Sequence, residues 1–319
     1  MVGAALANRT LRNWAPAFAG ERWGGCTGLG TGVTGQRRAA TARRMFDLDA
    51  YLARIALPAR VTTDAAGLGR LQLAHRLAIP FEDLDVMLGR GIRIDSEGVF
   101  AKLVTARRGG YCFEHNRLFR DALAALGFEA RPLLARVWLG VAADAAVPPL
   151  THTLTLVTVE GEAWIADAGF GGSYSPPMRL IDGEEVVAPD GARFRLVRDD
   201  AHDWMLLRDG DPELTDGRAT GDGFQRQFSF TTGRVEPIDL ALSNHWTSTA
   251  PGTRFTTLAI VSIALPNGFA SLTGRDYRRK SGENVQMAEI TDPRVYRLRL
   301  SMMFGIDLSA DEVAALGLF

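Results

Sequence analysis

Cysteine is scarce in this sequence, and its scarcity excludes two classes of protein. The 319 residues include only Cys26 and Cys112, with no CxxC pair and no His/Cys spacing typical of a zinc site. A disulfide-stapled fold is excluded, no bound metal is expected, and a reducing, cytoplasmic compartment is favoured. At least one thiol is then free, and its surroundings decide whether it is inert or nucleophilic.

Long apolar runs and an excess of charge of one sign are also missing. No run reaches the length of a membrane span, and 36 basic against 37 acidic residues leave a formal net charge of −1. Neither a membrane nor a nucleic acid is therefore expected as a partner. The 46% hydrophobic content and the length allow a large core in two or three domains. These features favour a globular protein acting on small molecules, as a monomer or homodimer.

Residues 1–44 differ in composition from the rest. They combine one acid, Glu21, with seven arginines: Arg9, Arg12, Arg22, Arg37, Arg38, Arg43 and Arg44. We interpret them as disordered, or as translated from a start codon upstream of the true one at Met45. A transit peptide would have the same composition. The GxGxxG match at 30–35 lacks the preceding strand and following helix of a dinucleotide site.

Hydrophobic periodicity from Met45 onward predicts an α+β fold in three domains: helices in 45–130, strands in 131–240 and an α/β portion in 241–319. Apolar spacing indicates helices near 46–55 and 68–77, and another over Cys112–Leu126 that Gly127 ends. The predicted strands, in a barrel or a sandwich, are Leu133–Leu139, His152–Val159, Ala163–Ala168, Phe194–Val197 and Trp204–Leu207. The last portion is expected to contain a strand, Thr257–Ala264, a charged strand-like segment, Tyr296–Leu300, and a final helix, Ser309–Leu316.

The segment Arg107–Asn116, RRGGYCFEHN, carries the most informative motif. Gly109 and Gly110 are expected to let the backbone turn tightly and to deliver Cys112 to the first turn of a helix, where the helix dipole stabilises a thiolate. Taken alone, Cys112 equally fits a small buried hydrophobe at a helix start. A partner base decides between the two interpretations.

His152 is the histidine best placed to be that base. It begins a strand that turns near Glu160-Gly161 and returns toward Asp167, and a two-residue turn places His152 and Asp167 on one face of the ladder. A three-residue turn would place them on opposite faces. His115 is too close to Cys112 along one helix for in-line proton transfer, so we interpret it as structural.

Cys112, His152 and Asp167 are the three residue types needed for a nucleophilic thiol, its base and the acid that orients the base. A carboxylate beside an imidazole fixes its tautomer and supports its charge, and an imidazolium lowers the pKa of a nearby thiol. Asp167 also fits a simple turn residue before the glycine-rich 169–172. The trio nonetheless predicts a nucleophilic cysteine with its base and orienting acid.

Four ordered motifs show that the chain from Met45 to Phe319 resembles the bacterial arylamine N-acetyltransferases. Ile79–Asp83 is similar to the family's IPFEN segment, and Arg107–Asn116 resembles its RRGGYCxExN signature. Thr151-His152 with Asp167–Gly171 is similar to its histidine strand and DVGFG loop. Ser248–Phe255 resembles its ST-P-F element.

The resemblance implies a helical bundle, a central β-barrel and an α/β lid, with a Cys-His-Asp triad like that of cysteine proteases and transglutaminases. It also implies ping-pong transfer of acetyl from acetyl-coenzyme A to a small aromatic amine or hydrazine. Cys112, His152 and Asp167 fall on the triad positions. Further implied roles are an acceptor pocket of Phe113, Phe170 and Phe255, coenzyme A contacts at Thr151, Gly171 and Gly172, and a supporting ion pair between Arg108 and Glu82. Each phenylalanine equally fits plain core packing.

Departures from the family pattern leave the acceptor preference open. Asp83 replaces the usual asparagine, Ala168 replaces valine, and the segment 183–223 is longer than in a compact member. Alternative functions are an amide synthase that releases a polyketide through the same acyl-cysteine, a thiol hydrolase of the transglutaminase or protease kind, and a non-catalytic binding module.

Overall fold

The computed structural model of the protein describes residues 46–142, 144–215, 218 and 223–319. The predictions made for residues 1–44, including the GxGxxG match at 30–35, lie outside the described residues.

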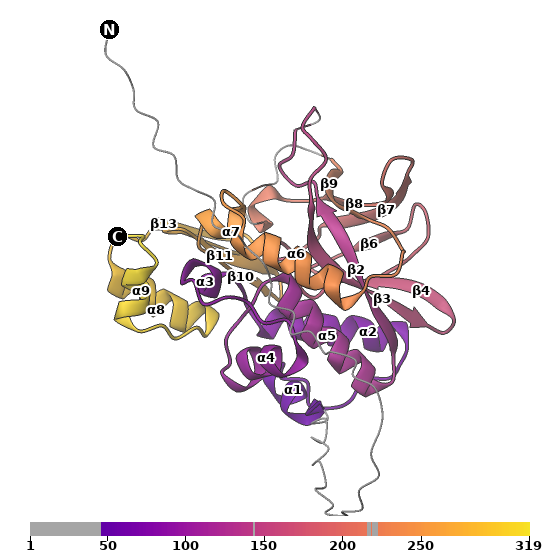
Figure 1. Ribbon diagram of the computed structural model, residues 1–319, viewed down its shortest axis with the longest axis horizontal. Coiled ribbons are helices and arrows are strands. Elements are labelled where there is room, and N and C mark those ends of the chain that lie inside the picture. Colours follow the sequence, from indigo (N-terminus) through magenta and orange to yellow (C-terminus); the bar gives the residue numbers. More distant parts are fainter. Residues whose placement is uncertain (1–45, 143, 216–217, 219–222) are drawn as a thin grey trace, which may run out of the picture. The chain divides into compact units, whose positions relative to one another are not determined.

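The first third is helical and packs around one apolar cluster (Figure 1). Tyr51, Leu68, Leu71, Phe119 and Leu123 are fully buried in it. Aspartates begin the first two helices by accepting hydrogen bonds from backbone N–H groups of the first turn. The helices are α1 (Leu48–Arg54), α2 (Ala65–Ala78), α3 (Leu84–Met87), α4 (Ser96–Phe100), which continues as a π-helical turn (Ala101–Thr105), and α5 (Cys112–Leu126).

Helix α5 has the predicted bounds. At its start the Glu114 carboxylate accepts a hydrogen bond from the Tyr111 backbone N–H at 3.0 Å. At its end Gly127 has a left-handed φ of 94°, and its N–H bonds back to the carbonyls of Leu123 and Ala124. The buried face of α5 packs on β2 and β3, so Cys112 lies where the helices meet the barrel.

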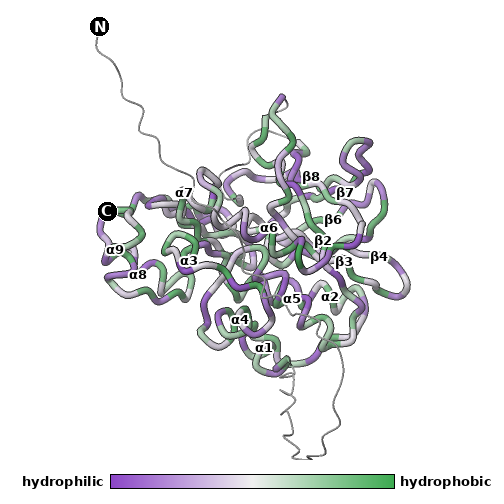
Figure 2. Tube along the Cα trace, viewed as in Figure 1, coloured by the Kyte–Doolittle hydropathy of each residue, from purple (hydrophilic) through white to green (hydrophobic). Residues whose placement is uncertain are grey.

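The middle of the chain is an antiparallel sheet of eight strands that curves into a nearly closed barrel. Leu133, Leu154, Phe194 and Phe228 are buried in its core. Hydrophilic residues gather at its hairpin loops, such as those next to β4 and β7 (Figure 2). In spatial order the strands are β5 (Met178–Arg179), β4 (Glu162–Ala166), β3 (Leu150–Val159), β2 (Glu129–Val137), β9 (Gln225–Phe230), β8 (Asp203–Asp209), β7 (Arg193–Asp199) and β6 (Glu185–Val187).

The β3–β4 hairpin has the two-residue turn predicted from the sequence. Glu160 and Gly161 both have positive φ, 51° and 84°, and the pairing runs from Val159 opposite Glu162 to Thr155 opposite Ala166. On the other side of β3 the ladder with β2 is irregular. Ala135 pairs with His152 but Arg136 pairs with Leu150, so Thr151 is a bulge.

The last third builds a second antiparallel sheet with helices beside it (Figure 1). Its edge strand, β1 (Phe81–Glu82), comes from the helical third and pairs with β10, so the two parts share backbone hydrogen bonds. The remaining strands are β10 (Ile260–Leu265), β11 (Gly268–Thr273), β12 (Asp276–Ser281) and β13 (Asn284–Glu289). The helices are α6 (Pro237–Thr249), α7 (Arg254–Thr257), α8 (Pro293–Phe304) and α9 (Ala310–Ala315). The fold class predicted from the sequence is confirmed.

One predicted element is wrong. Tyr296–Leu300, expected as a strand, lies inside α8. Alternating arginines and apolar residues imitate a strand, but Asp292 caps a helix that Pro293 opens and Gly305 closes. The apolar residues that are buried are Tyr296, Leu300 and Phe304, one helical turn apart.

Candidate active site

Three secondary-structure elements bring Cys112, His152 and Asp167 to one place. Cys112 is the first residue of α5, His152 lies on β3, and Asp167 follows the last residue of β4. The His152 Nε2 and Asp167 Oδ2 atoms are 2.7 Å apart. The three residues are only 3%, 2% and 6% exposed. The hairpin register therefore places the imidazole and carboxylate together, as diagonal neighbours on one face.

The Cys112 thiol donates a hydrogen bond to the backbone oxygen of Thr151, 3.7 Å away. That carbonyl belongs to the bulge of β3. Burial and the charge of Asp167 raise the pKa of Cys112. A thiolate buried here would be costly unless an imidazolium forms beside it. The sequence-based expectation of a thiolate stabilised by the helix dipole is thus incomplete, because burial opposes it.

Asp167 remains ionised despite its burial. Desolvation alone would raise its pKa, but the charge of His152 and hydrogen bonds from His152, Asn116 and Gly169 hold the pKa below its usual value. Asn116 Nδ2 donates to Asp167 Oδ1 at 3.0 Å and to the Thr153 backbone oxygen at 2.6 Å. Asn116 therefore ties α5, the helix that begins at Cys112, to both β3 and Asp167.

Gly169 sets how closely the loop after β4 approaches α5. A Cβ at this position would lie 2.9 Å from the Cys112 Cα, the His115 Cβ and the Asn116 Nδ2. No side chain fits there without moving the helix. The glycine is thus required for Asp167 to reach His152 while the loop packs against the turn that holds Cys112.

A small pocket of about 110 Å³ opens at Cys112. Cys112 and His152 line it together with the aromatic rings of Phe81, Phe170 and Phe255. The ring of Phe170 packs edge-on to the His152 ring, with centroids 5.1 Å apart. The space suits a single aromatic ring or an acyl group more than a large ligand.

Some of the residues predicted to contact substrate or coenzyme A line this pocket and others do not. Thr151 lines this pocket, as do Phe170 and Phe255, whereas Phe113 is buried in an apolar cluster and is not among the lining residues. Phe81, which the sequence analysis did not single out, is on the pocket wall. Its place in the Ile79–Asp83 motif is the sequence signal that could have singled it out.

Gly171 and Gly172 have structural partners of their own. The Gly171 oxygen accepts a hydrogen bond from Ser262 Oγ at 2.7 Å, and the Gly172 oxygen accepts one from Arg76 at 2.6 Å. Neither glycine lines the two cavities described for this chain. Their predicted contact with coenzyme A stays a prediction.

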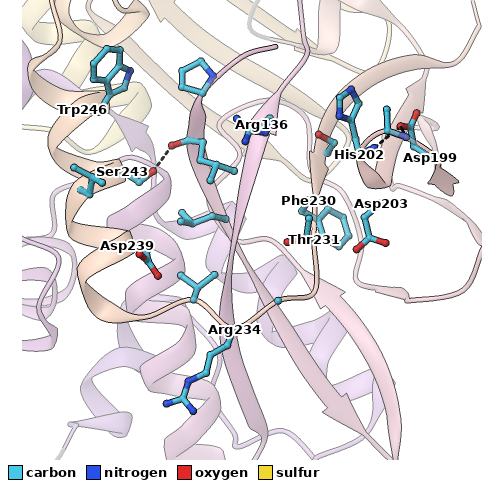
Figure 3. Close-up of a pocket in the computed structure, with 18 of the residues that line it drawn as sticks. Arg136, Asp199, His202, Asp203, Phe230, Thr231, Arg234, Asp239, Ser243 and Trp246 are labelled. Atoms are coloured by element: carbon cyan, nitrogen blue, oxygen red, sulfur yellow. Dashed lines mark hydrogen bonds between the residues drawn. The ribbon is translucent and has the colours of Figure 1, made fainter.

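A larger cavity of about 1090 Å³ lies beside α6 and the ends of β2, β3 and β9 (Figure 3). Trp246, Ser243 and Asp239 face it from α6, and His202 faces it from the β7–β8 turn. Arginines and aspartates both line it, among them Arg136, Arg198, Arg234, Asp199 and Asp203. Its lining and that of the small pocket come from the same three elements, β2, β3 and α6, with 136/137, 150/151 and 246/247 contributing one residue to each.

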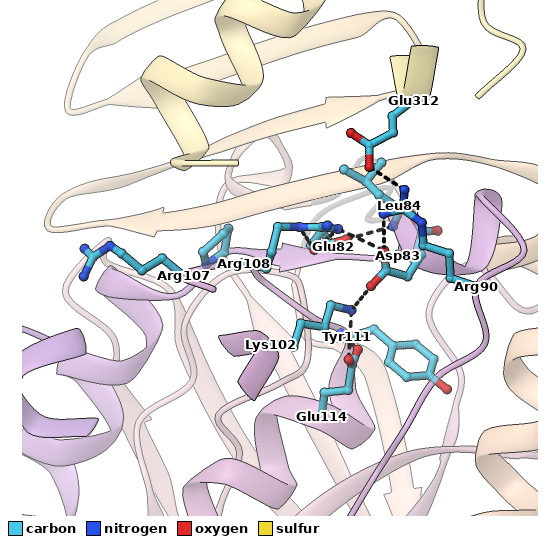
Figure 4. Close-up of polar contacts among 12 residues, drawn as sticks. Glu82, Asp83, Leu84, Arg90, Lys102, Arg107, Arg108, Tyr111, Glu114 and Glu312 are labelled. Carbon is cyan, nitrogen blue, oxygen red and sulfur yellow. Dashed lines mark hydrogen bonds and ion pairs between the residues drawn. The ribbon is translucent and has the colours of Figure 1, made fainter. Parts of the chain in front are cut away.

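The predicted ion pair between Arg108 and Glu82 is present (Figure 4). Arg108 donates from two nitrogens to Glu82 Oε1, at 3.0 and 2.7 Å, and also reaches Asp85 Oδ1 at 3.2 Å. Arg90 continues the chain of charges from Asp85 to Glu312 on α9. Glu82 is fully buried, so losing the arginine would leave an uncompensated charge.

The same network reaches the start of α5, the helix that begins at Cys112. Lys102 Nζ lies 2.8 Å from both Asp85 Oδ2 and Glu114 Oε1. Burial, only partly offset by Lys102, raises the pKa of Glu114 to about 7. The cap of α5 therefore contains a carboxyl group that titrates near neutral pH.

Gly109 and Gly110 have a different role from the predicted tight turn. A Cβ on Gly109 would lie 2.2 Å from the Pro80 oxygen, and one on Gly110 would lie 2.7 Å from Glu114 Oε2. Neither glycine has a positive φ. They make room for the neighbouring backbone and for the carboxylate that caps α5.

Asp83, where the family pattern has asparagine, is almost fully buried. Its Oδ1 accepts a hydrogen bond from the Ile260 N–H at 2.7 Å, which links the helical third to β10. Burial raises the pKa of this carboxyl well above its usual value. Asp83 therefore connects the helical part of the chain to β10.

A buried chain of rings supports the helix behind the trio. The Tyr51 hydroxyl lies 2.9 Å from His75 Nδ1, and His75 Nε2 lies 2.9 Å from His115 Nδ1. His115 Nε2 then donates to the Pro80 oxygen at 3.0 Å. With that donor fixed, His75 donates to His115 and accepts from Tyr51, so both imidazoles are neutral.

We expect these two histidines to make the protein acid-labile. Burial lowers the pKa of His115 to about 3 and that of His75 well below its usual 6.5. The unfolded chain then binds protons below pH 6.5 that the folded chain does not. The free energy of unfolding should fall as pH drops from 6.5 toward 3, by about 1.4 kcal/mol per pH unit for each histidine. Urea unfolding between pH 7 and 4.5 measures the slope, and His115→Gln should flatten it. An equal slope in that variant would contradict the assignment.

Metal and membrane signatures are both missing from the described part of the chain. No cluster of three or more His, Cys, Asp or Glu side chains among the described residues could hold a metal ion. None of the helices in 46–319 that the structure describes combines the length and apolar character needed to span a bilayer.

Comparison with known proteins agrees with this geometry. The sequence model of the N-acetyltransferase family matches residues 64–313. An arylamine N-acetyltransferase / N-hydroxyarylamine O-acetyltransferase from Salmonella typhimurium is 36% identical over 266 residues, which cover 82% of this chain and 89% of the relative. An arylamine N-acetyltransferase from Mycolicibacterium smegmatis is 36% identical over 274 residues, 82% of this chain and 93% of the relative.

Solved structures show the same relationship. The arylamine N-acetyltransferase from Salmonella typhimurium matches with a TM-score of 0.77 and 32% identity, covering 85% of this chain and 98% of that one. The Mycobacterium marinum enzyme in complex with CoA matches with a TM-score of 0.75 and 29% identity, over 85% of this chain and 98% of that one.

Fold and site together define an α+β protein with a cysteine, a histidine and an aspartate assembled where a helical region meets a barrel. Such an arrangement is typical of enzymes that work through an acylated cysteine. The chain belongs to the arylamine N-acetyltransferase family, and the resemblance seen in the sequence is confirmed.

Proposed function

We propose that the protein transfers acetyl from acetyl-coenzyme A to arylamines, arylhydrazines or N-hydroxyarylamines through an acetyl-Cys112 intermediate. The observation that carries the proposal is the 2.7 Å contact of His152 with Asp167 beside Cys112, in a pocket walled by aromatic rings. The names of the relatives support the acceptor class, and the CoA complex of a related protein supports the donor.

The first half-reaction needs a thiolate. His152 Nε2 is engaged by Asp167, which leaves Nδ1 as the nitrogen that takes the Cys112 proton. The thiolate attacks the acetyl carbonyl, the bond to the coenzyme A sulfur breaks, and the departing thiolate takes the proton back from the imidazolium. Cys112 is left acetylated and His152 neutral. Asp167 supports the positive charge while it exists.

The second half-reaction regenerates the enzyme. The uncharged amine attacks the acetyl-cysteine carbonyl, the carbon–sulfur bond breaks, and His152 takes the proton that the amine nitrogen loses. The ion pair of thiolate and imidazolium is restored. Phe81, Phe170 and Phe255 give the pocket an apolar wall that admits an aromatic ring and disfavours water.

The hydrolase alternative predicts that water, not the amine, discharges the acyl-enzyme, so that the discharge rate does not depend on added arylamine. We expect the acetyl-enzyme to be discharged faster in proportion to added arylamine, with only slow loss in buffer. Rapid-quench measurement of acetyl-enzyme with and without arylhydrazine tests this. An unchanged decay rate would favour a thiol hydrolase over a transferase.

We also propose that the large cavity beside α6 receives the nucleotide part of coenzyme A. The same three elements, β2, β3 and α6, line both this cavity and the small pocket that holds Cys112, which supports a donor that spans the two. Arg136, Arg198 and Arg234 line it with guanidinium groups suited to phosphates, which would compete with Asp203 for Arg198 and with Glu236 for Arg234. The 53% exposed Trp246 offers a face for the adenine.

Trp246→Ala should raise the KM for acetyl-coenzyme A on the order of tenfold and leave kcat within about twofold, because it removes a stacking surface remote from the thiol. Ile238→Ala is the matched control, since Ile238 is exposed on the same helix but does not line the cavity. Equal KM values for the two variants would show that the nucleotide does not bind in this cavity. Initial rates at varied donor concentration measure the effect.

A further inference from the structure

The loop from Asp167 to Ser175 belongs to no helix or strand, yet it carries two parts of the proposed site. Asp167 orients the histidine, and Phe170 walls the pocket. Such a segment needs partners for its backbone groups, because buried unpaired N–H and C=O groups are costly. Asn116, Asp167 and Ser262 satisfy three of these groups, and another three are satisfied by one helix that lines neither cavity, α2.

A single side chain of α2 holds both ends of this loop. Gln72 Oε1 accepts a hydrogen bond from the Asp167 N–H at 3.0 Å, and Gln72 Nε2 donates to the Ser175 oxygen at 2.7 Å. One helical turn further on, Arg76 donates to the Gly172 oxygen at 2.6 Å. The loop is therefore fastened at its first, sixth and ninth residues.

Because these side chains are buried, losing their hydrogen bonds would cost free energy that water could not restore. Gln72 is fully buried and Arg76 is 3% exposed. An amide in this position has both its donor and its acceptor used by the loop, so replacing it leaves backbone groups of the loop without partners. Arg76 adds charge to the same arrangement, since it attracts Asp167, although burial keeps the pKa of Arg76 below its usual value.

We propose that Gln72 is a positioning residue for the catalytic trio: by fastening the backbone of Asp167 and Ser175, it fixes the carboxylate at hydrogen-bonding distance from His152. It touches neither substrate nor thiol. Its effect on Cys112 passes through Asp167 and His152. The inference rests on the proposed acyl-cysteine function, but its test requires neither acetyl-coenzyme A nor an amine.

The test is the pH dependence of Cys112 alkylation by iodoacetamide, which reports how readily the thiolate forms. Gln72→Met keeps the length of the side chain and removes both hydrogen bonds. We expect the alkylation rate at pH 7 to fall on the order of tenfold and the midpoint of the pH profile to rise, because the imidazolium loses its aligned carboxylate. Iodoacetamide reacts with the Cys112 thiolate directly. The result therefore does not depend on whether the protein transfers acetyl groups.

His75→Leu is the matched control. His75 lies on the same helix and is equally buried, but its hydrogen bonds go to Tyr51 and His115, not to the loop. We expect it to lose stability while the alkylation profile keeps its midpoint. A Gln72→Met protein whose profile matches the wild type overturns the proposal, and so do equal shifts of the midpoint in both variants.

Gln72→Glu provides a second measurement if the methionine variant fails to fold. A protonated glutamate can accept from the Asp167 N–H and donate to the Ser175 oxygen, whereas an ionised one loses the donor and faces the charge of Asp167. Of the titratable groups nearby, Asp167 is contacted by Gln72 through its backbone, Arg76 lies one turn along α2, and Asp167 and Tyr174 both act on Arg76. Relative to wild type, its alkylation rate should be closer at pH 6 than at pH 8. An alkylation rate equal to that of the wild type at both pH values overturns the proposal.

Discussion

Replacing Cys112 with alanine should abolish acetyl transfer completely, since no other group in the described site can form the acyl intermediate. Cys112 lines the small pocket together with His152, and its thiol donates a hydrogen bond to the Thr151 backbone oxygen. Intact mass spectrometry after mixing with acetyl-coenzyme A measures the effect. The wild type should gain one acetyl group that disappears when an arylamine is added, and the variant should gain none.

Cys26→Ala is the natural control, because it removes the only other cysteine of the sequence. It should acetylate and discharge as the wild type does. Acetylation of the Cys112→Ala protein at the wild-type level would sink the proposed mechanism. A wild type that gains no acetyl group would direct the search to another acyl donor or to a binding function.

Asp167→Asn should reduce kcat by about 10³ to 10⁴, with the fold intact. The amide would donate to His152 Nε2 in place of accepting from it, which stabilises the tautomer with hydrogen on Nδ1. That nitrogen could then no longer take the thiol proton. The carboxamide is nearly isosteric, so Asn116 and Gly169 still provide partners at the same site.

Two measurements separate this effect from misfolding. The urea midpoint should change little compared with the loss of activity, and the alkylation profile of Cys112 should move to higher pH. An Asp167→Asn enzyme with kcat within about tenfold of wild type would show that Asp167 does not fix the tautomer. Asp167→Ala is less informative, because it also leaves Asn116 Nδ2 without the carboxylate it donates to.

Local patterns carried most of what could be predicted from the sequence. Helix α5 begins and ends where apolar spacing and Gly127 indicated, because a capping carboxylate and a left-handed glycine are local signals. The β3–β4 hairpin followed from its two-residue turn, and with it the proximity of His152 to Asp167. Where a short segment alternated by accident, as in Tyr296–Leu300, the same reasoning failed.

Contacts between distant segments could not be predicted in this way. Gln72 meets Asp167 across 95 residues, and nothing in an amphipathic helix marks one glutamine as a loop anchor. Phe81 reaches the pocket because β1 joins a sheet completed by β10, far along the chain. Burial of Cys112 likewise depends on elements from all three parts, so its raised pKa has no sequence signal.

The bulge at Thr151 lets β3 pair in different registers with its two neighbours, β4 and β2. Toward β4 the register is strict, because it sets His152 against Asp167. Toward β2 the ladder skips one residue, and the skipped residue is the one whose carbonyl meets the thiol. Removing that residue would restore a regular ladder with β2 without changing the spacing from His152 to Asp167. Evolution could therefore adjust how the nucleophile is held, by a single insertion or deletion, while leaving the base and its carboxylate as they are.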